Sequence, residues 1–244
     1  MSTHLEPAAA LADADFVRHA LAAMPSVIDF LPAGSEADFL PINTDTNWAS
    51  GPAKRAFDLL FTVPLLLLLA PFLAVLALLV RIDSRGPVLF RQERSGICGK
   101  RFAILKFRTM TVLENGEDVV QARAGDPRVT RAGRWLRRYS LDELPQLLNV
   151  LAGDMSLVGP RPHARAHDAF YAQRISGYGH RHSVKPGITG WAQVNGHRGP
   201  TPTMEAMSRR VDFDLWYARH SSFALDLEIL LRTPLELLRA RNAF

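Results

Sequence analysis

The hydrophobic residues of this chain are concentrated in one run. Residues 59–80 form 22 consecutive positions without a charged side chain, and Pro64 and Pro71 lie inside this run. As a single helix the run would rise about 33 Å, which is enough to cross a hydrocarbon core of roughly 30 Å. The pattern therefore predicts a membrane-inserted segment, which we place with its flanks at residues 51–84.

The two prolines and the flanking charges bear on how this segment enters the membrane. Each proline removes a backbone hydrogen bond and presses on the preceding turn. Basic residues, which favour the cytoplasmic side, flank the run at both ends: Lys54, Arg55, Arg81 and Arg85. A re-entrant helix that bends at Ala70-Pro71 satisfies both observations, with Thr62, water or packed protein as partners for the freed carbonyls. A plain transmembrane anchor is the alternative.

The sequence after the membrane segment changes to short alternating stretches. Residues 88–92 and 100–107 alternate well enough for two strands, with residues 96–99 turning between them. Residues 126–130 lead into a helix, and a second helix begins at Ser140.

Loops and one more helix complete the expected domain. Gly and Pro mark residues 153–162 and 185–199 as loops, and residues 225–241 have helical periodicity with a leucine face that suits a membrane surface. The expected fold is α+β and α-rich. It comprises a re-entrant helix-break-helix and, at residues 85–244, a small cytoplasmic catalytic domain with amphipathic surface helices.

Charge is distributed unevenly along the chain. Residues 1–50 carry a net charge of −6, so the remainder carries +11 of the total of +5. A basic body of this kind suits anionic lipid, nucleotide phosphates or nucleic acid. The single Cys98 excludes an internal disulfide, and the first 20 residues lack the pattern of a secretory signal. We treat residues 1–50 as an N-terminal extension of unknown function and expect the catalytic part in the cytoplasm.

An acidic pair is the main chemical candidate. Ser140 and Glu143 match a helix capping box, which is the structural explanation of this motif. Several arginines lie upstream at helical spacing, and together with a helix N-terminus they favour the ionised form of Asp142. An ionised carboxylate can attack phosphorus or hold a divalent metal. The upstream arginines are Arg131, Arg134, Arg137 and Arg138.

Three other stretches could contact an anionic ligand. Pro160 and Pro162 fix the backbone on either side of Arg161, which presents its guanidinium for bidentate binding of phosphate or a base edge, or for a surface salt bridge. Lys106 and Arg108 alternate around an aromatic residue, as an ordinary strand end could also do. The glycine-rich residues 185–191 could approach a ligand closely, and they end in Trp191, which is either an interfacial anchor or core packing.

Several known site patterns are absent from the sequence. There is no GxxxxGK[ST] phosphate-binding loop and no GxSxG nucleophile elbow. His163 and His167 are four residues apart, but the acid of a metalloprotease motif is missing.

Taken together, these residues resemble the bacterial sugar transferases, which are monotopic polyprenyl-phosphate phosphoglycosyl transferases. The resemblance runs from about Lys54 to the C-terminus. It rests on ordered motifs: KRAFDLL, GPVLFRQERSG, LKFRTM, DPRVTRAGRWLRRYSLDELPQLLNVLAGDMSLVGPRP and VKPGITGWAQVNG. The family's membrane segment is a re-entrant helix-break-helix that usually breaks at Ser-Pro, where this chain has Ala70-Pro71.

The resemblance implies a reaction. Such enzymes transfer a sugar 1-phosphate from a UDP-sugar to undecaprenyl phosphate, release UMP and begin exopolysaccharide or related glycan assembly. Asp142 matches the nucleophile that forms a covalent intermediate, and Glu143 matches the acid that binds Mg²⁺. Arg161 with its flanking prolines and Arg137 match nucleotide-binding positions, and Lys106 and Arg108 lie in a matching motif.

The same resemblance implies location and partners. It places the protein at the bacterial inner membrane, among its lipids, with the catalytic domain on the cytoplasmic face. Nucleic acid is not an expected partner, and a homo-oligomer is compatible with the sequence. The stretches PRPHARAH and NGHRGPTPTMEAMSRRVDFD look most like glucose-1-phosphate transferases of exopolysaccharide synthesis, so we expect UDP-glucose as donor.

Other interpretations remain open at this point. Galactose or an N-acetylhexosamine could replace glucose. A non-catalytic adaptor that binds anionic lipid would leave the acidic pair without a role. A phosphodiesterase that hydrolyses UDP-sugars would turn over without a lipid acceptor.

Overall fold

The structure is a computed structural model that describes residues 48–111, 125–199 and 201–239. The chain divides into two units, residues 1–34 and 35–244, and every described residue belongs to the second unit. Most of the predicted N-terminal extension therefore lies outside the described residues.

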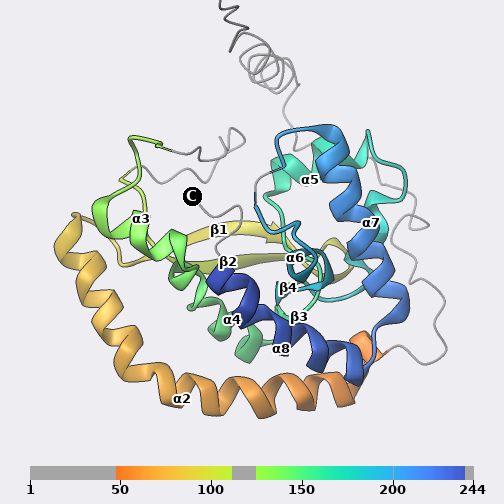
Figure 1. Ribbon diagram of the computed structural model, residues 1–244, viewed down its shortest axis with the longest axis horizontal. Coiled ribbons are helices and arrows are strands. Elements are labelled where there is room, and N and C mark those ends of the chain that lie inside the picture. Colours follow the sequence, from red (N-terminus) through yellow and green to blue (C-terminus); the bar gives the residue numbers. More distant parts are fainter. Residues whose placement is uncertain (1–47, 112–124, 200, 240–244) are drawn as a thin grey trace, which may run out of the picture. The chain divides into compact units, whose positions relative to one another are not determined.

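The predicted membrane segment is one long helix, α2 (Pro52–Asp83), with Pro52 in its first turn and Pro64 and Pro71 in its interior. Figure 1 shows that α2 turns strongly part-way along its length. The helix-break-helix expectation is thus corrected: the backbone stays helical through Ala70 and Pro71, and the direction changes by bending. The hydroxyl of Thr62 makes no hydrogen bond to any described residue, so it does not satisfy a carbonyl freed by a proline.

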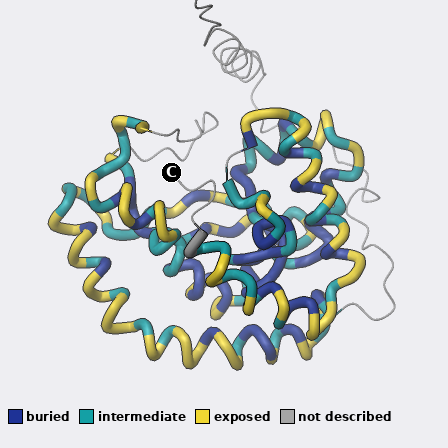
Figure 2. Tube along the Cα trace, in the orientation of Figure 1, coloured by how far each residue is buried: buried dark blue, intermediate teal, exposed yellow. Residues whose placement is uncertain are grey.

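Both ends of α2 contact the same domain. Near its start, Lys54 forms ion pairs with Asp58 and Asp226. Near its end, Leu76 and Val80 pack in one cluster with residues of β2 (Arg101–Phe107) and α3 (Arg131–Arg138), and the carboxylate of Asp83 accepts a hydrogen bond from a main-chain amide of α3. Between these contacts α2 is largely exposed (Figure 2). α2 is long and apolar enough to cross a membrane.

The two predicted strands are confirmed. β1 (Leu89–Ser95) and β2 (Arg101–Phe107) pair antiparallel from Leu89 opposite Phe107 to Ser95 opposite Arg101. A short 3-10 turn, Ile97–Gly99, joins them where the glycines predicted a turn. Alternate positions of β2 face the core, since Phe102 and Ile104 are buried.

The two predicted loops are partly wrong, because each contains a strand. β3 (Ser156–Val158) pairs in parallel with β4 (Gly187–Thr189), and the short helix α6 (Trp191–Val194) follows. All three residues of β3 are buried, so the segment shows no alternation of polar and apolar positions. The strands approach so closely that a Cβ on Gly187 would lie 2.1 Å from the amide nitrogen of Gly159.

Helices surround these two small sheets (Figure 1). The helix expected after residues 126–130 is confirmed as α3, and the final helix is confirmed as α8. The helix expected from Ser140 begins with a 3-10 turn, Leu141–Glu143, and becomes α-helical only at Gln146. Among the described residues, the helices that follow α2, apart from α6, are α3 (Arg131–Arg138), α4 (Gln146–Ala152), α5 (Arg165–Ala172), α7 (Met204–His220) and α8 (Phe223–Arg239).

Candidate active site

The acidic pair lies in the 3-10 turn between α3 and α4. Ser140, just before this turn, adopts a left-handed conformation with φ of 54° and makes no side-chain capping bond. Its hydroxyl accepts a hydrogen bond from Arg198 instead, and the Glu143 side chain reaches across to β2 and to Arg161. The capping box is therefore not formed, and both of its side chains take part in long-range contacts.

Glu143 is held by two cations from distant segments. Arg161 donates from Nη1 to Oε2 at 2.9 Å and from Nη2 to Oε1 at 2.5 Å, and Lys106 Nζ lies 2.8 Å from Oε1. Burial disfavours the charged carboxylate, but the Arg161 and Lys106 charges outweigh it and hold the pKa of Glu143 well below its ordinary value. Glu143 is therefore ionised and fixed in orientation.

Asp142 behaves in the opposite way. It is half-buried, and within the part of the chain that the structure describes no hydrogen bond or ion pair engages its carboxylate. Burial and the neighbouring Glu143 charge raise the pKa of Asp142, against the opposing influence of Lys106, Arg137 and Arg161. The predicted influence of nearby arginines agrees with the direction in which Arg137 acts, but burial and the Glu143 charge, which the sequence analysis did not consider, outweigh it.

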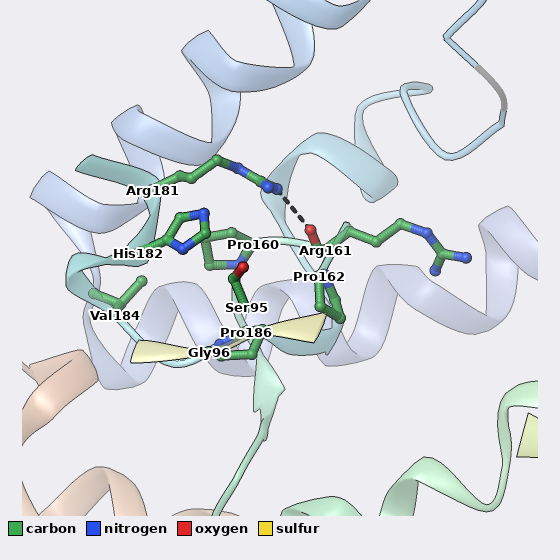
Figure 3. A pocket seen from close by; sticks show the side chains of 9 residues that line it. All are labelled: Ser95, Gly96, Pro160, Arg161, Pro162, Arg181, His182, Val184 and Pro186. Carbon is green, nitrogen blue, oxygen red and sulfur yellow. Dashed lines mark hydrogen bonds between the residues drawn. The ribbon is translucent and has the colours of Figure 1, made fainter. Parts of the chain in front are cut away.

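The loop that carries Arg161 is fixed at three main-chain oxygens. Gly187 donates its amide to Pro160 O at 2.9 Å, and Arg94 donates to Pro162 O at 3.3 Å. The buried Arg181 donates to Arg161 O at 2.6 Å; Figure 3 shows this guanidinium directed at that oxygen, while the Arg161 side chain extends away from the small pocket behind the loop. The prolines and these bonds together orient Arg161 toward Glu143.

Positive charge exceeds negative charge around the pair. Burial and the Arg161 charge lower the pKa of Arg94 to about 10, and burial lowers the pKa of Arg198. The sequence analysis gave neither residue a role of its own, although Arg94 lies in the motif GPVLFRQERSG and Arg198 in the stretch NGHRGPTPTMEAMSRRVDFD. The cations that act electrostatically on Asp142 or Glu143 are Arg94, Lys106, Arg137, Arg161 and Arg198.

Two of the predicted binding residues differ in their placement. Arg137 influences the Asp142 carboxylate, and its Nη1 lies 3.5 Å from the sulfur of Met110. Arg108 is buried, and its Nη2 donates to Ser84 O at 2.5 Å, at the end of α2. The structure thus brings Arg137 to the acidic pair and directs Arg108 to the helix end instead, so binding of substrate by Arg108 gains no support from its contacts.

The glycine-rich residues 185–191 support the Arg161 loop. A Cβ on Gly190 would meet Gly159 O at 2.2 Å, so the small residues allow close approach of main chain to main chain. Trp191 packs against the core, with its ring centroid 5.0 Å from that of Trp216 and the Arg232 guanidinium 5.2 Å from it. Of the two interpretations of Trp191, these contacts favour packing.

The pair could accept a Mg²⁺ ion. Mg²⁺ is commonly held by one or two carboxylates together with water and substrate phosphates. Three of the roughly four lone pairs of the Glu143 carboxylate are used, which leaves one on Oε2. The described residues contain no group of three or more acidic, His or Cys side chains that could hold a metal ion, so a Mg²⁺ at Glu143 would need substrate phosphates and water as its other ligands.

Comparison with known proteins gives the family. The sequence profile described as "Bacterial sugar transferase" matches residues 49–240, which includes α2, the acidic pair and the Arg161 loop. The chain belongs to the bacterial sugar transferase family. This confirms the resemblance carried by the sequence motifs.

Relatives within this family share about half of the aligned residues. The chain is 56% identical over 180 residues to the UDP-glucose:undecaprenyl-phosphate glucose-1-phosphate transferase of Escherichia coli (strain K12), which covers 74% of this chain and 39% of the relative. It is 53% identical over 191 residues to the protein of the same name from Caulobacter vibrioides, covering 78% and 72%. Against the N-acetylgalactosaminephosphotransferase of Aeromonas hydrophila, identity is 39% over 180 residues, covering 74% and 42%.

Proposed function

We propose that this protein transfers a sugar 1-phosphate, glucose 1-phosphate in the first instance, from a UDP-sugar to undecaprenyl phosphate. The observation that carries the proposal is the contrast within the acidic pair. The half-buried Asp142 carboxylate makes no hydrogen bond to the described residues, whereas Glu143 is held by Arg161 and Lys106.

The surrounding charge supports a phosphate-bearing substrate. Five cations act on the two carboxylates, so the immediate surroundings of the acidic pair favour an anionic ligand such as a diphosphate. Arginine guanidiniums suit phosphate oxygens because their donors are arranged as a planar fork. The guanidinium charge also offsets the negative charge of a neighbouring carboxylate, so that carboxylate repels an anionic substrate less.

The proposed reaction has two displacements at one phosphorus. In the first, an Asp142 oxygen attacks the phosphorus that bears the sugar, the bond to the bridging oxygen breaks, and UMP leaves with that electron pair. In the second, a phosphate oxygen of undecaprenyl phosphate attacks the same phosphorus, and the Asp142 carboxylate is released. Arg161 and Arg137 stabilise charge on the phosphoryl oxygens in both steps. A Mg²⁺ held by Glu143 would supply further charge neutralisation.

Asp142 attacks in its ionised form. Burial and the Glu143 charge raise the pKa of Asp142, and the charges of Lys106, Arg137 and Arg161 lower it. The ionisation of Asp142 when a diphosphate binds at the arginines therefore depends on these cations. A carboxylate with a raised pKa is also the more basic of the pair. These properties suit Asp142 as nucleophile and Glu143 as the permanently charged neighbour.

The names of the relatives support glucose as the donor sugar. Two relatives more than half identical to this chain are named for UDP-glucose, while one of lower identity is named for UDP-N-acetylgalactosamine. UDP-glucose is therefore the donor we propose, and UDP-galactose or a UDP-N-acetylhexosamine is the alternative. The matched region spans about two fifths of the Escherichia coli relative, so activity and partners are proposals for this chain.

The packing of α2 supports a re-entrant position in the membrane. Lys54 near its start and Val80 near its end both contact the domain that holds the acidic pair. Ends separated by a hydrocarbon core of roughly 30 Å could not both reach one domain outside it. We therefore place the catalytic domain on one face, the cytoplasmic face of the inner membrane, with the bend of α2 in the lipid.

The test is UMP release by detergent-purified protein with Mg²⁺ and UDP-glucose, with and without undecaprenyl phosphate. Acceptor-dependent turnover supports the transferase. Equal turnover without acceptor would indicate a phosphodiesterase, and the absence of turnover with UDP-glucose, UDP-galactose and UDP-N-acetylhexosamines would favour an anionic-lipid-binding adaptor.

A further inference from the structure

Asn149 on α4 joins that helix to the edge of the neighbouring sheet. Its side chain is buried, and its amide makes two hydrogen bonds with the main chain of β2. Oδ1 accepts from the Leu105 amide at 2.9 Å, and Nδ2 donates to the Ala103 carbonyl oxygen at 2.8 Å. Both groups of the side-chain amide are therefore used, one as acceptor and one as donor.

These bonds satisfy an otherwise open strand edge. β2 pairs with β1 in a sheet of two strands, and within residues 48–111, 125–199 and 201–239 no strand pairs with the other edge of β2. An unpaired and buried main-chain N–H or C=O costs free energy comparable to a lost hydrogen bond. The Asn149 amide offers one donor and one acceptor, as a neighbouring strand would, so it fixes α4 along the length of β2.

The fixed position matters because both elements carry site residues. Lys106 directly follows Leu105 on β2, and Glu143 lies in the turn that leads into α4. The link between these elements at the site is the 2.8 Å contact from Lys106 Nζ to Glu143 Oε1. A slip of α4 along β2 would lengthen this contact.

Asn149 also bonds to the segment that leads to Arg161. Its main-chain oxygen accepts from the amides of Gly153 and Asp154 at 3.0 Å, in the turn between α4 and β3. Met155 donates to the same oxygen at 3.2 Å. One residue therefore ties together the three segments that supply Lys106, Glu143 and Arg161.

We propose that Asn149 is a positioning residue for the reaction, which sets the register of β2 against the acidic turn so that Lys106 reaches Glu143. The inference rests on the proposed function and deepens it. Asn149 touches no reacting atom, and its effect on turnover passes through Lys106. A displacement of the order of 1 Å at a reacting site can cost about 10²-fold in rate, so a small slip is sufficient.

A double-mutant cycle on the full chain in detergent tests whether Asn149 acts through Lys106. We expect Asn149→Ala and Lys106→Met each to lower kcat by about tenfold or more. In the Lys106→Met background, Asn149→Ala should cost less than about threefold further, because coupled residues are not additive. Additive losses in the double variant would overturn the proposal.

Asn149→Asp supplies a readout that general loss of structure would not give. The carboxyl group that replaces the amide can accept from Leu105 when ionised but cannot donate to Ala103, whereas its protonated form can do both. We expect the kcat of Asn149→Asp relative to wild type to rise as pH falls through the raised pKa of this buried carboxyl. A ratio that is independent of pH would contradict the proposal.

Thr233→Val is the matched control. It removes both side-chain hydrogen bonds of Thr233, at 2.8 Å with Thr189 between α8 and β4 and at 2.7 Å to the Ile229 carbonyl oxygen, and neither bond involves α4 or β2. We expect it to retain kcat within about twofold and to combine with Lys106→Met by simple additivity.

The outcomes for wild type and for the Asn149 variants separate the two proposals. If the wild-type protein is inactive with every donor, the proposed function is refuted. If the wild-type protein is active and the folded Asn149 variants are fully active, this inference alone is refuted.

Discussion

Arg161 holds Glu143 through two parallel hydrogen bonds, from Nη1 to Oε2 at 2.9 Å and from Nη2 to Oε1 at 2.5 Å. This two-point contact fixes the charge and the orientation of the acid next to Asp142. The two adjacent carboxylates differ in pKa: the Arg161 and Lys106 charges outweigh burial and lower the pKa of Glu143, whereas burial and the Glu143 charge raise the pKa of Asp142. Neighbouring carboxylates with pKa values moved apart are characteristic of acids with separate roles.

The two-point contact predicts that lysine cannot replace Arg161. Arg161→Lys keeps the charge but loses the planar fork, so kcat should fall by about 10²-fold as measured by UMP release. Arg165→Lys is the matched control, since Arg165 pairs with Glu93 at 3.5 Å in a largely exposed contact. Similar losses in both variants would show that the fork geometry is unimportant.

The pKa of Asp142 predicts a trade between activity and stability. Because folding raises this pKa, the stability linked to Asp142 is present below its unfolded pKa and is lost as pH rises through the folded pKa. Asp142→Asn should therefore abolish turnover and raise the melting temperature at neutral pH, with a smaller gain in acid. A lower melting temperature at neutral pH, measured by thermal unfolding in detergent, would contradict the shift.

Arg137 predicts a change in the pH dependence of turnover. Its charge lowers the pKa of Asp142, so Arg137→Gln should raise that pKa further and move the acid limb of kcat against pH to higher pH. Arg138→Gln, on the same helix, is the control. An acid limb that moves to lower pH, or moves equally in both variants, would show that Arg137 does not act on the nucleophile.

The buried ion cluster at the start of α2 predicts a large effect on stability. Lys54 lies 3.1 Å from Asp58 and 2.7 Å from Asp226, and all three side chains are 3% exposed or less. Lys54→Met should lower the free energy of unfolding by about 3–5 kcal/mol, because it leaves two buried carboxylates without their cation. Glu228→Gln, which breaks an exposed pair with Arg232, should cost no more than about 1 kcal/mol in the same denaturation assay.

The re-entrant position of α2 predicts the side on which its ends are labelled. Ser50 and Arg85 flank the helix and are exposed, so each can carry a single cysteine in a Cys98→Ser background. A membrane-impermeant maleimide should label both cysteines in inverted vesicles and neither in intact spheroplasts. Labelling of the two positions from opposite sides would establish a spanning helix.

Local patterns predicted the elements whose residues alternate or repeat. The alternation of β2, the glycines before Arg101 and the apolar run of α2 each identified an element that the structure contains. β3 was missed because three buried residues beside Gly159 look like a loop. Its stability comes from pairing with β4, about thirty residues later, which no short window of sequence reveals.

The residues of the site also differ in whether the sequence could identify them. Asp142, Glu143 and Arg161 could be singled out because their motifs combine unusual residue types at close spacing. Asn149 could not, since its partners Ala103 and Leu105 lie more than 40 positions away. The raised pKa of Asp142 also escaped prediction, because burial is a property of the folded chain.

The most direct test of the central claim is to look for the covalent phosphosugar on Asp142. Wild-type protein would be incubated with UDP-glucose and Mg²⁺ without undecaprenyl phosphate, and then analysed by intact-protein and peptide mass spectrometry. The account predicts an adduct of one hexose phosphate on the peptide containing Asp142, discharged by undecaprenyl phosphate and absent in Asp142→Asn. Acceptor-dependent UMP release by an Asp142→Asn variant that never carries an adduct would contradict it.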